Sequence, residues 1–510
     1  MPPHRRSSAA PAIPGGSEMA THARGGQTPH ALATIALAAL LASAWPGPSA
    51  AQPAPQFART DYGVASSPFG VAIAHLNGDE HPDVVVANRG SNTVSRWLGD
   101  GTGGVFGCRD FTVGTGPFAV AIADLDGNGA LDLATANIDD QSISVLLGDG
   151  AGGFAPKSDY ATDVTPLSIA IADLNGDGKP DLVTANHSGH SLSILLGTGG
   201  GAFSPAVSVR IGQYPYALAV GDLNHDGKPD VAAVNFYANT VSVRLGKGGT
   251  RFGPIRAFAT GINPSSIAIG DLSRDEIPDL LVANSSSNTV SVLRGDGSGA
   301  FSAKVDYATE VNPVTATIGD INADGEPELA VTNKVSNSVS VFLANPTGGF
   351  DPKLDFAVGR NAWGVAIRDL NGVGSPDLAV TNANDATVSI LVQVTGDPRQ
   401  AASTRLTSNL NPVRVGHAAT FKATVSPSAV TGTVQFLDGK ELLGTAPLNS
   451  GTATLTVPSL LPGPHAITAV YGGDAGYRPS ISPVLSQSVR GLSAGLRFPP
   501  TARRPRSRRR

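Results

Sequence analysis

The sequence is poor in cysteine, in aromatic residues and in charge. It contains one cysteine, Cys108, so no disulfide can form within the chain, and stability has to come from packing, repetition or bound metal. Aromatic residues make up 5% of the 510 residues and charged residues 15%, and no part of the chain after the leader shows the spacing of a long amphipathic helix. Glycine (61) and proline (38) are abundant, a composition that favours short strands joined by tight turns.

The charge is unevenly distributed along the chain. The formal net charge is −5, to which residues 1–51 contribute +2 and six arginines among the last eight residues contribute +6, so the part between them carries about −13. A body this acidic disfavours nucleic acid and anionic membranes as partners and favours cations. Residues 491–510 are predicted to form a basic disordered tail.

The N-terminus has the pattern of an export signal. Ala31–Trp45 is an apolar run of 15 residues, too short to span a bilayer comfortably, and Ser49 and Ala51 provide the small residues that a signal peptidase requires. We predict a signal peptide at residues 1–51, with Met19 as an alternative start, and therefore export, with no transmembrane segment after cleavage. An uncleaved membrane anchor is the alternative.

A nine-residue motif, DLNGDGKPD at Asp173–Asp181, recurs along the chain at intervals of 49 residues. Its first position falls at His75, Asp124, Asp173, Asp222, Asp271, Asp320 and Asp369. An asparagine, a serine and, in six copies, a proline keep the same step, beginning at Asn88, Ser95 and Pro68. A fixed period of this length indicates a solenoid, a propeller or an array of repeats.

Each repeat is predicted to contain four short strands, which in the second copy are PFAVAIADL, LDLATAN, SISVLLGD and KSDYATD. The first strand alternates small and bulky apolar residues, so both of its faces are expected to be buried, as in a propeller blade between two like blades. Seven motif copies predict seven blades over residues 52–394. The seventh copy lacks a fourth strand, and Phe57–Gly70 is expected to complete it and close the ring, which removes exposed sheet edges.

The motif carries oxygen side chains at positions 1, 3, 5 and 9 and can offer its carbonyl at position 7. In the third copy these groups belong to Asp173, Asn175, Asp177, Asp181 and Lys179. Calcium takes six to eight hard oxygen ligands in a loose geometry, and a glycine at position 6 permits the turn that folds the loop around one point. An Asx-rich turn capped by its own side chains, without metal, is the alternative.

The pattern D-x-[DN]-x-D-G-x-x-D, repeated after strands such as AVAIADL, resembles the FG-GAP (VCBS-type) repeats of integrin α-subunit propellers and of many bacterial exported proteins. The resemblance covers about Phe57–Val394 and implies a seven-bladed propeller with calcium in loops on one face. Carried over residue by residue, it implies five metal loops: Asp124/Asp126/Asn128/Asp132, Asp173/Asn175/Asp177/Asp181, Asp222/Asn224/Asp226/Asp230, Asp271/Ser273/Asp275/Asp279 and Asp320/Asn322/Asp324/Glu328.

Three copies depart from the pattern. Glu276 replaces the glycine in the fifth loop, His75 replaces the first carboxylate in the first loop, and Val373 removes a ligand from the seventh. We expect the first and seventh loops to bind calcium weakly or not at all. The ions are expected to be structural, with dissociation constants of about 10⁻⁴–10⁻³ M, as in other extracellular modules.

The face opposite the predicted calcium loops is the candidate ligand face. The starts of the first strands and the turns after the second strands are expected to lie there and to bring aromatic rings together. These candidates are Phe69, Phe118, Tyr214, Tyr216, Trp363, His187, His190 and Tyr237, with Phe236 beside Tyr237 in the same turn. Rings at a propeller mouth can stack on sugars or contact a protein partner. Packing between blades is the alternative.

The period ends at a linker, residues 395–402. Thr433–Ser480 alternates like strands, with hairpin turns at DGK and NSG. Residues 403–490 resemble bacterial Ig-like repeat domains, which implies a β-sandwich without a disulfide that acts as a spacer or an adhesion unit. The predicted fold is therefore all-β, a seven-bladed β-propeller followed by an Ig-like β-sandwich, in a bacterial protein that is secreted or attached to the cell surface.

These features predict a non-catalytic, calcium-binding module for adhesion or ligand binding, with an unknown protein or glycan as its ligand. A carbohydrate-binding lectin and a carbohydrate-active enzyme that uses the face opposite the calcium loops are the alternatives. No insertion breaks the 49-residue step and no Ser/His/Asp set is evident. The nearest approach to a catalytic set is His187 and His190 with Asp139 or Asp140 of the preceding repeat, so no catalytic residue is predicted.

Overall fold

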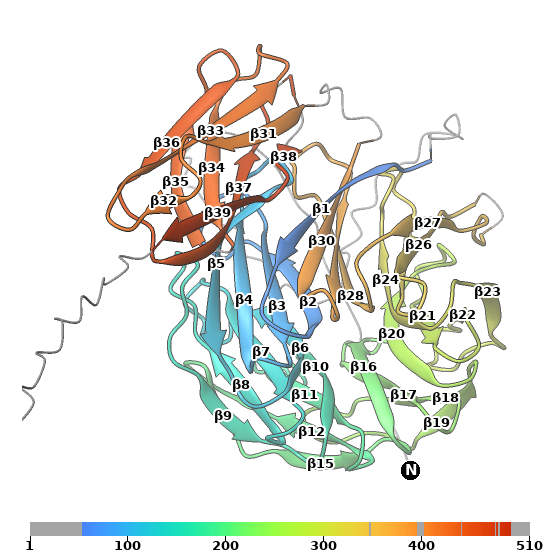
Figure 1. The fold of residues 1–510 in the computed structure, drawn as a ribbon. Coiled ribbons are helices and arrows are strands. Elements are labelled where there is room, and N and C mark those ends of the chain that lie inside the picture. Colours follow the sequence, from blue (N-terminus) through green and yellow to red (C-terminus); the bar gives the residue numbers. More distant parts are fainter. Residues whose placement is uncertain are drawn as a thin grey trace, which may run out of the picture. The chain divides into compact units, whose positions relative to one another are not determined.

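The computed structural model describes residues 54–345, 348–394, 402–439, 441–474, 476–477 and 480–490. All regular elements in these ranges are β-strands, shown in Figure 1. No helix in the described ranges is long and apolar enough to cross a membrane. The predicted signal peptide, the linker up to residue 401 and the basic tail lie outside the described residues.

Seven four-stranded antiparallel sheets follow one another between residues 57 and 393 and form the blades of a propeller. Blade 1 contains β2 (Pro68–Ala74), β3 (Asp83–Asn88), β4 (Thr93–Gly99) and β5 (Val105–Thr112); blade 2 contains β6 (Pro117–Ala123), β7 (Asp132–Asn137), β8 (Ser142–Leu146) and β9 (Ser158–Ala161). Blade 3 contains β10 (Pro166–Ala172), β11 (Asp181–Asn186), β12 (Ser191–Leu195) and β15 (Val207–Arg210); a two-stranded hairpin, β13 (Gly197–Gly199) and β14 (Ala202–Phe203), lies within it.

The remaining blades repeat this order. Blade 4 contains β16 (Pro215–Gly221), β17 (Asp230–Asn235), β18 (Thr240–Arg244) and β19 (Arg256–Ala259); blade 5 contains β20 (Pro264–Gly270), β21 (Asp279–Asn284), β22 (Thr289–Leu293) and β23 (Val305–Ala308). Blade 6 contains β24 (Pro313–Gly319), β25 (Glu328–Asn333), β26 (Ser338–Phe342) and β27 (Leu354–Ala357); blade 7 contains β28 (Ala362–Arg368), β29 (Asp377–Asn382), β30 (Thr387–Gln393) and β1 (Phe57–Gly63).

The core of the propeller lies between neighbouring blades. All six residues of each second strand are buried, in all seven blades. One buried cluster, for example, joins Ala134 and Ile143 of blade 2 to Ile169 and Leu182 of blade 3. Because each blade buries its apolar faces against two others, a single blade would not be stable by itself.

The two ends of the propeller meet in blade 7. β1 pairs antiparallel with β30 along its whole length, from Phe57 opposite Gln393 to Gly63 opposite Thr387. Figure 1 shows the N-terminal β1, in blue, beside the orange β30. The first strands contact one another in ring order, and β28 contacts β2, so the ring is closed. Because the ring is closed, blade 7 packs against blade 1 and neither blade exposes a sheet edge at the junction.

A buried asparagine in every blade explains one of the periodic sequence markers. Its side-chain amide donates a hydrogen bond of 2.8 or 2.9 Å to a serine hydroxyl on the third strand. The pairs are Asn88–Ser95, Asn137–Ser144, Asn186–Ser193, Asn235–Ser242, Asn284–Ser291, Asn333–Ser340 and Asn382–Ser389. A buried amide without partners is costly, so a blade that keeps the asparagine has to keep the serine as well.

The C-terminal part of the chain folds as two β-sheets. The first contains β31 (Ser403–Ser408), β33 (Ala419–Ser426) and β36 (Thr452–Val457). The second contains β32 (Val413–Arg414), β39 (Leu485–Arg490), β37 (Gly463–Tyr471), β34 (Thr433–Asp438) and β35 (Glu441–Pro447), with β38 (Ser480–Ile481) paired to β37. Fully buried Phe421, Phe436 and Tyr471 form the centre of its core. This is the β-sandwich that the resemblance to bacterial Ig-like domains implies.

Candidate functional site

The nine-residue loops connect the first and second strands of the blades, and in six of the seven loops an aspartate at position 1 accepts backbone N–H bonds that hold the turn together. In blade 2, Asp124 accepts backbone N–H bonds from Gly127 (2.7 Å) and Gly129 (2.8 Å). Both glycines have a positive φ, +82° and +90°, a conformation that favours glycine. The sequence DLDGNG therefore forms a compact loop whose first carboxylate is fixed from inside.

The carboxylate at position 9 is buried and connects the loop to the third strand. Asp132 accepts the N–H of Leu125 at 2.7 Å through one oxygen and the N–H of Gly148 at 2.6 Å through the other. The equivalent residue accepts the same two backbone bonds in every blade; these residues are Asp83, Asp181, Asp230, Asp279, Glu328 and Asp377. This structural role was not predicted, because the motif alone suggests only a metal ligand.

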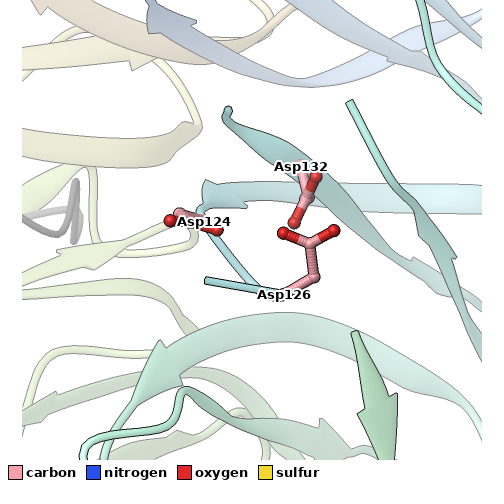
Figure 2. Close-up of side chains that lie close together, drawn as sticks. All are labelled: Asp124, Asp126 and Asp132. Atoms are coloured by element: carbon pink, nitrogen blue, oxygen red, sulfur yellow. The ribbon is translucent and has the colours of Figure 1, made fainter. Parts of the chain in front are cut away.

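Two loops bring three carboxylates to one point. Oxygens of Asp124, Asp126 and Asp132 lie within 4.8 Å of one another, and so do those of Asp320, Asp324 and Glu328. Figure 2 shows the carboxylates of Asp126 and Asp132 facing each other, with Asp124 beside them. Like charges this close repel unless a cation or protons neutralise them. All the donor atoms are hard oxygens, so the sets fit a calcium ion.

Burial makes these clusters costly in the metal-free state. Burial, with a smaller contribution from nearby carboxylates, raises the pKa of Asp132 to about 6 and that of Glu328 to about 8. The backbone N–H bonds to each group act in the opposite direction. A divalent cation would favour the deprotonated form, so metal binding and proton release are coupled.

The third and fourth loops have the predicted residues in the same turn but a different arrangement of charge. Lys179 at position 7 lies 3.6 Å from Asp177, and Lys228 lies 3.5 Å from Asp226. The side chains of both lysines are almost half exposed, so the ion pairs are weak. Asp173, Asn175 and Asp181 in one loop and Asp222, Asn224 and Asp230 in the other keep the backbone bonds of the fold.

The fifth loop is strained and is tied to its neighbour. Glu276, in place of the glycine, has a φ of +66°, which is unfavourable for a residue with a side chain. Asp271 still accepts N–H bonds from Asp275 and Glu276, and Asp279 is buried, while Ser273 offers only a hydroxyl. Arg274 forms an ion pair with Glu326 of the sixth loop, where Asn322 donates to Asp324 at 2.8 Å.

The first and seventh loops lack a complete set of ligands. In the first, the buried Nδ1 of His75 has no hydrogen-bond partner among the described residues. In the seventh, Val373 is 39% exposed and offers only its backbone, while burial raises the pKa of Asp377 to about 7. In the second loop, by contrast, Asn128 donates to Asp126 at 2.9 Å and lies beside the carboxylate cluster.

On the opposite face, three of the predicted aromatic residues pack against one another. The ring of Phe69 lies 4.5 Å from that of Trp363 and 4.9 Å from that of Phe118. They line one end of a cavity of about 250 Å³ that the first strands of all seven blades surround. The Nζ of Lys334 lies 4.4 Å from the Trp363 ring, a cation–π contact.

A second aromatic cluster lies between blades 3 and 4. His187 contacts the rings of Tyr214 (5.2 Å), Tyr216 (6.1 Å) and Tyr237 (6.0 Å). Phe236, which precedes Tyr237 in the turn after the second strand, stacks on Tyr216 at 5.1 Å with an interplanar angle of 27°.

His190 connects two blades. Its Nδ1 accepts the backbone N–H of Tyr214 at 2.9 Å, which fixes the ring in the tautomer protonated at Nε2. In four other blades an asparagine at the same repeat position accepts the corresponding N–H at 2.8–2.9 Å; these residues are Asn92, Asn239, Asn288 and Asn337. We call this contact the blade clamp. His190 therefore fixes the backbone at Tyr214, which is part of the aromatic cluster.

Comparison with protein families agrees with this geometry. A model described as FG-GAP-like repeat matches residues 75–135, 129–184, 173–233, 222–282, 274–331 and 320–380. The chain belongs to the FG-GAP-like repeat family. A second model, described as bacterial Ig-like domain (group 3), matches residues 406–490 of this FG-GAP-like protein. Together they confirm both resemblances that the sequence suggests.

Solved structures resemble the FG-GAP-like chain at low sequence identity. They include BBS1N in complex with ARL6DN (12% identity, 67% of this chain and 97% of that chain covered, TM-score 0.49) and the periplasmic gluconolactonase PpgL of Pseudomonas aeruginosa (15%, 77% and 100%, 0.44). A third is a putative 6-phosphogluconolactonase of Bacteroides uniformis (17%, 56% and 84%, 0.44). No curated protein matches significantly.

Proposed function

We propose that this protein is an exported calcium-binding β-propeller that serves as a non-catalytic module for ligand binding or adhesion. The observation that carries the proposal is the convergence of Asp124, Asp126 and Asp132 within 4.8 Å in a loop that the chain repeats. Calcium neutralises these carboxylates and fixes the hairpin, and the rigid blades present the opposite face to a ligand.

Export is supported by the predicted signal peptide and by the match to a bacterial Ig-like domain. In this proposal the Ig-like domain is a spacer or an additional adhesion unit. The acidic propeller repels nucleic acid and anionic lipid, so in this proposal its ligand is a protein or a glycan outside the cell.

Two of the four side chains nearest to a catalytic set, His190 and Asp140, already have structural partners, which supports a non-catalytic role. The Nδ1 of His190 is engaged in the blade clamp. Asp140 accepts a backbone N–H from Thr115, which lies in the turn before β6, the first strand of the same blade. Neither group is therefore available as a general base without loss of a bond that holds the fold.

The experiment that tests this function measures calcium and ligand binding on the mature protein. Calcium should bind at millimolar concentration, and the protein should bind glycan or cell-surface protein in calcium and lose binding in EDTA. Turnover of a carbohydrate substrate, or no calcium binding at 10 mM, would contradict the proposal.

A further inference from the structure

Five aromatic side chains meet on the surface between blades 3 and 4, and none of them is buried: His187, Tyr214, Tyr216, Phe236 and Tyr237. We call these residues the blade 3–4 patch. Tyr237 is the most accessible, with 62% of its surface exposed. It contacts Tyr214 at 5.0 Å and Phe236 at 5.1 Å, each with an interplanar angle of 90°, so its ring is held in one orientation although most of it is in solvent.

The polar atoms of the patch have unused hydrogen-bonding capacity. Among the described residues, no hydrogen bond reaches the hydroxyls of Tyr214, Tyr216 or Tyr237, or either ring nitrogen of His187. Burial lowers the pKa of His187, and the neighbouring His190 lowers it further, which favours the neutral imidazole. The patch thus offers apolar ring faces together with neutral donors and acceptors.

The fold does not require these rings. At the repeat position of Tyr237, blades 3 and 5 have Ser188 and Ser286. At the position of Tyr214, blades 5, 6 and 7 have Asn263, Asn312 and Asn361. Tyr214 has a φ of +53°, a conformation that asparagine adopts readily and a bulky residue adopts only at a cost. Thr165 of blade 3 accepts the same conformation (φ +62°), but only blade 4 has an aromatic ring there. A local cost that asparagine would avoid is compatible with a functional role of the ring.

We propose that the blade 3–4 patch is a binding subsite for a neutral saccharide. The inference rests on the proposed function, since it names the ligand class of that binding module. The apolar C–H face of a sugar ring covers the exposed ring of Tyr237, and its hydroxyls pair with the free tyrosine hydroxyls and with His187.

The chemistry of the patch favours a sugar over a protein. An apolar protein side chain docked here would remove the three hydroxyls and the imidazole from water without giving them partners, and that loss opposes binding. A saccharide carries a hydroxyl on most of its carbons and can pair them all. The five side chains include no lysine or arginine to pair with an anion, so a neutral glycan fits better than a sialylated or sulfated one.

The test uses the full mature chain, loaded with calcium, on an array of neutral, sialylated and sulfated oligosaccharides, followed by calorimetry with the best neutral hexasaccharide. Tyr237→Ser and Tyr214→Asn introduce residues that other blades have at the same positions, so both variants should fold. The matched control is Val335→Ser, which removes the exposed apolar side chain at the Tyr237 position of blade 6.

We expect binding of neutral glycans, a loss of at least tenfold in affinity in Tyr237→Ser, and unchanged affinity in Val335→Ser. Binding of acidic glycans only, a Tyr237→Ser variant that binds like wild type, or no binding of any glycan would overturn the inference. The melting shift with calcium, measured on the same samples, separates the two proposals. If that shift persists and a peptide or protein binds while no glycan does, the saccharide subsite alone is wrong.

Discussion

Ser389 donates a hydrogen bond of 2.6 Å to Asp61, although 328 residues separate them in the chain. Ser389 also receives the amide bond of the buried Asn382, so the contact continues a polar chain through blade 7 into the N-terminal strand β1. Four other blades make the same serine–aspartate bond between their third and fourth strands, through Asp110, Asp159, Asp306 and Asp355. In blade 7 alone this bond joins the two ends of the propeller.

Asp61→Ala should weaken ring closure without unfolding the chain. Blade 4 has Ala257 at the same repeat position and forms a complete sheet. The Asp61 side chain is 38% exposed, so we expect a loss of about 1 kcal/mol in the free energy of unfolding. Asp159→Ala is the control, because β8 and β9 are consecutive in the chain whereas β1 and β30 are not. Urea unfolding should show a larger loss for Asp61→Ala, and equal losses would contradict a special role in closure.

His190→Asn and His190→Ala should separate the blade clamp from any role of the ring itself. Asparagine occupies this position in blades 1, 4, 5 and 6 and accepts the same bond, so His190→Asn should keep wild-type stability. His190→Ala leaves the N–H of Tyr214 without its acceptor and should cost about 1 kcal/mol. Thermal melting checks both. Equal stability of the two variants would show that the clamp contributes nothing.

The metal-free protein should lose stability as the pH rises. Burial raises the pKa of Asp230 to about 6, of Asp377 to about 7 and of Glu328 to about 8, so the folded chain holds protons that the unfolded chain releases. This contribution is complete below about pH 4 and is lost progressively up to about pH 8. Melting in EDTA across this range measures it. Glu328→Gln should reduce the dependence above pH 6, and a metal-free stability that rises from pH 5 to 8 would contradict the pKa shifts.

The sequence could predict the sheets because every repeat needs the same buried residues at the same step. The asparagine and the serine that recur every 49 residues, beginning at Asn88 and Ser95, already mark the second and third strands. The structure adds the hydrogen bond that links them. Alternation along Thr433–Ser480 predicts strands and places Phe436 inside the sandwich, whereas the Ig-like fold itself followed from the resemblance.

The candidate metal site could be predicted only in part, because loops with similar sequences arrange their carboxylates differently in space. Lys179 at position 7 pairs with Asp177, whereas the second loop has no lysine and its carboxylates converge. The sequence shows the lysine, but it shows neither how the carboxylates are arranged around it nor the backbone bonds to the buried Asp132. His190 was predicted to lie on the ligand face because the turns after the second strands open there. The sequence did not reveal its bond to the backbone of Tyr214, which an asparagine at the same repeat position makes in four other blades.

Calcium binding to the two convergent loops is the claim that most needs measurement. Titration of the mature protein at pH 7.5, by calorimetry and by melting, should show binding at millimolar calcium and a rise in melting temperature larger than magnesium gives. With dissociation constants of 10⁻⁴–10⁻³ M, each occupied site should add about 1–3 kcal/mol at 10 mM calcium.

Three variants make this titration specific. Asp126→Ala and Asp324→Ala should each remove one of the two convergent calcium sites. Val373→Asp, which supplies the missing carboxylate of the seventh loop, should increase the amount of calcium bound. The account predicts a calcium-induced rise in melting temperature that shrinks in the first two variants. A melting temperature that does not change with 10 mM calcium, or that rises equally in wild type and in both aspartate variants, would contradict it.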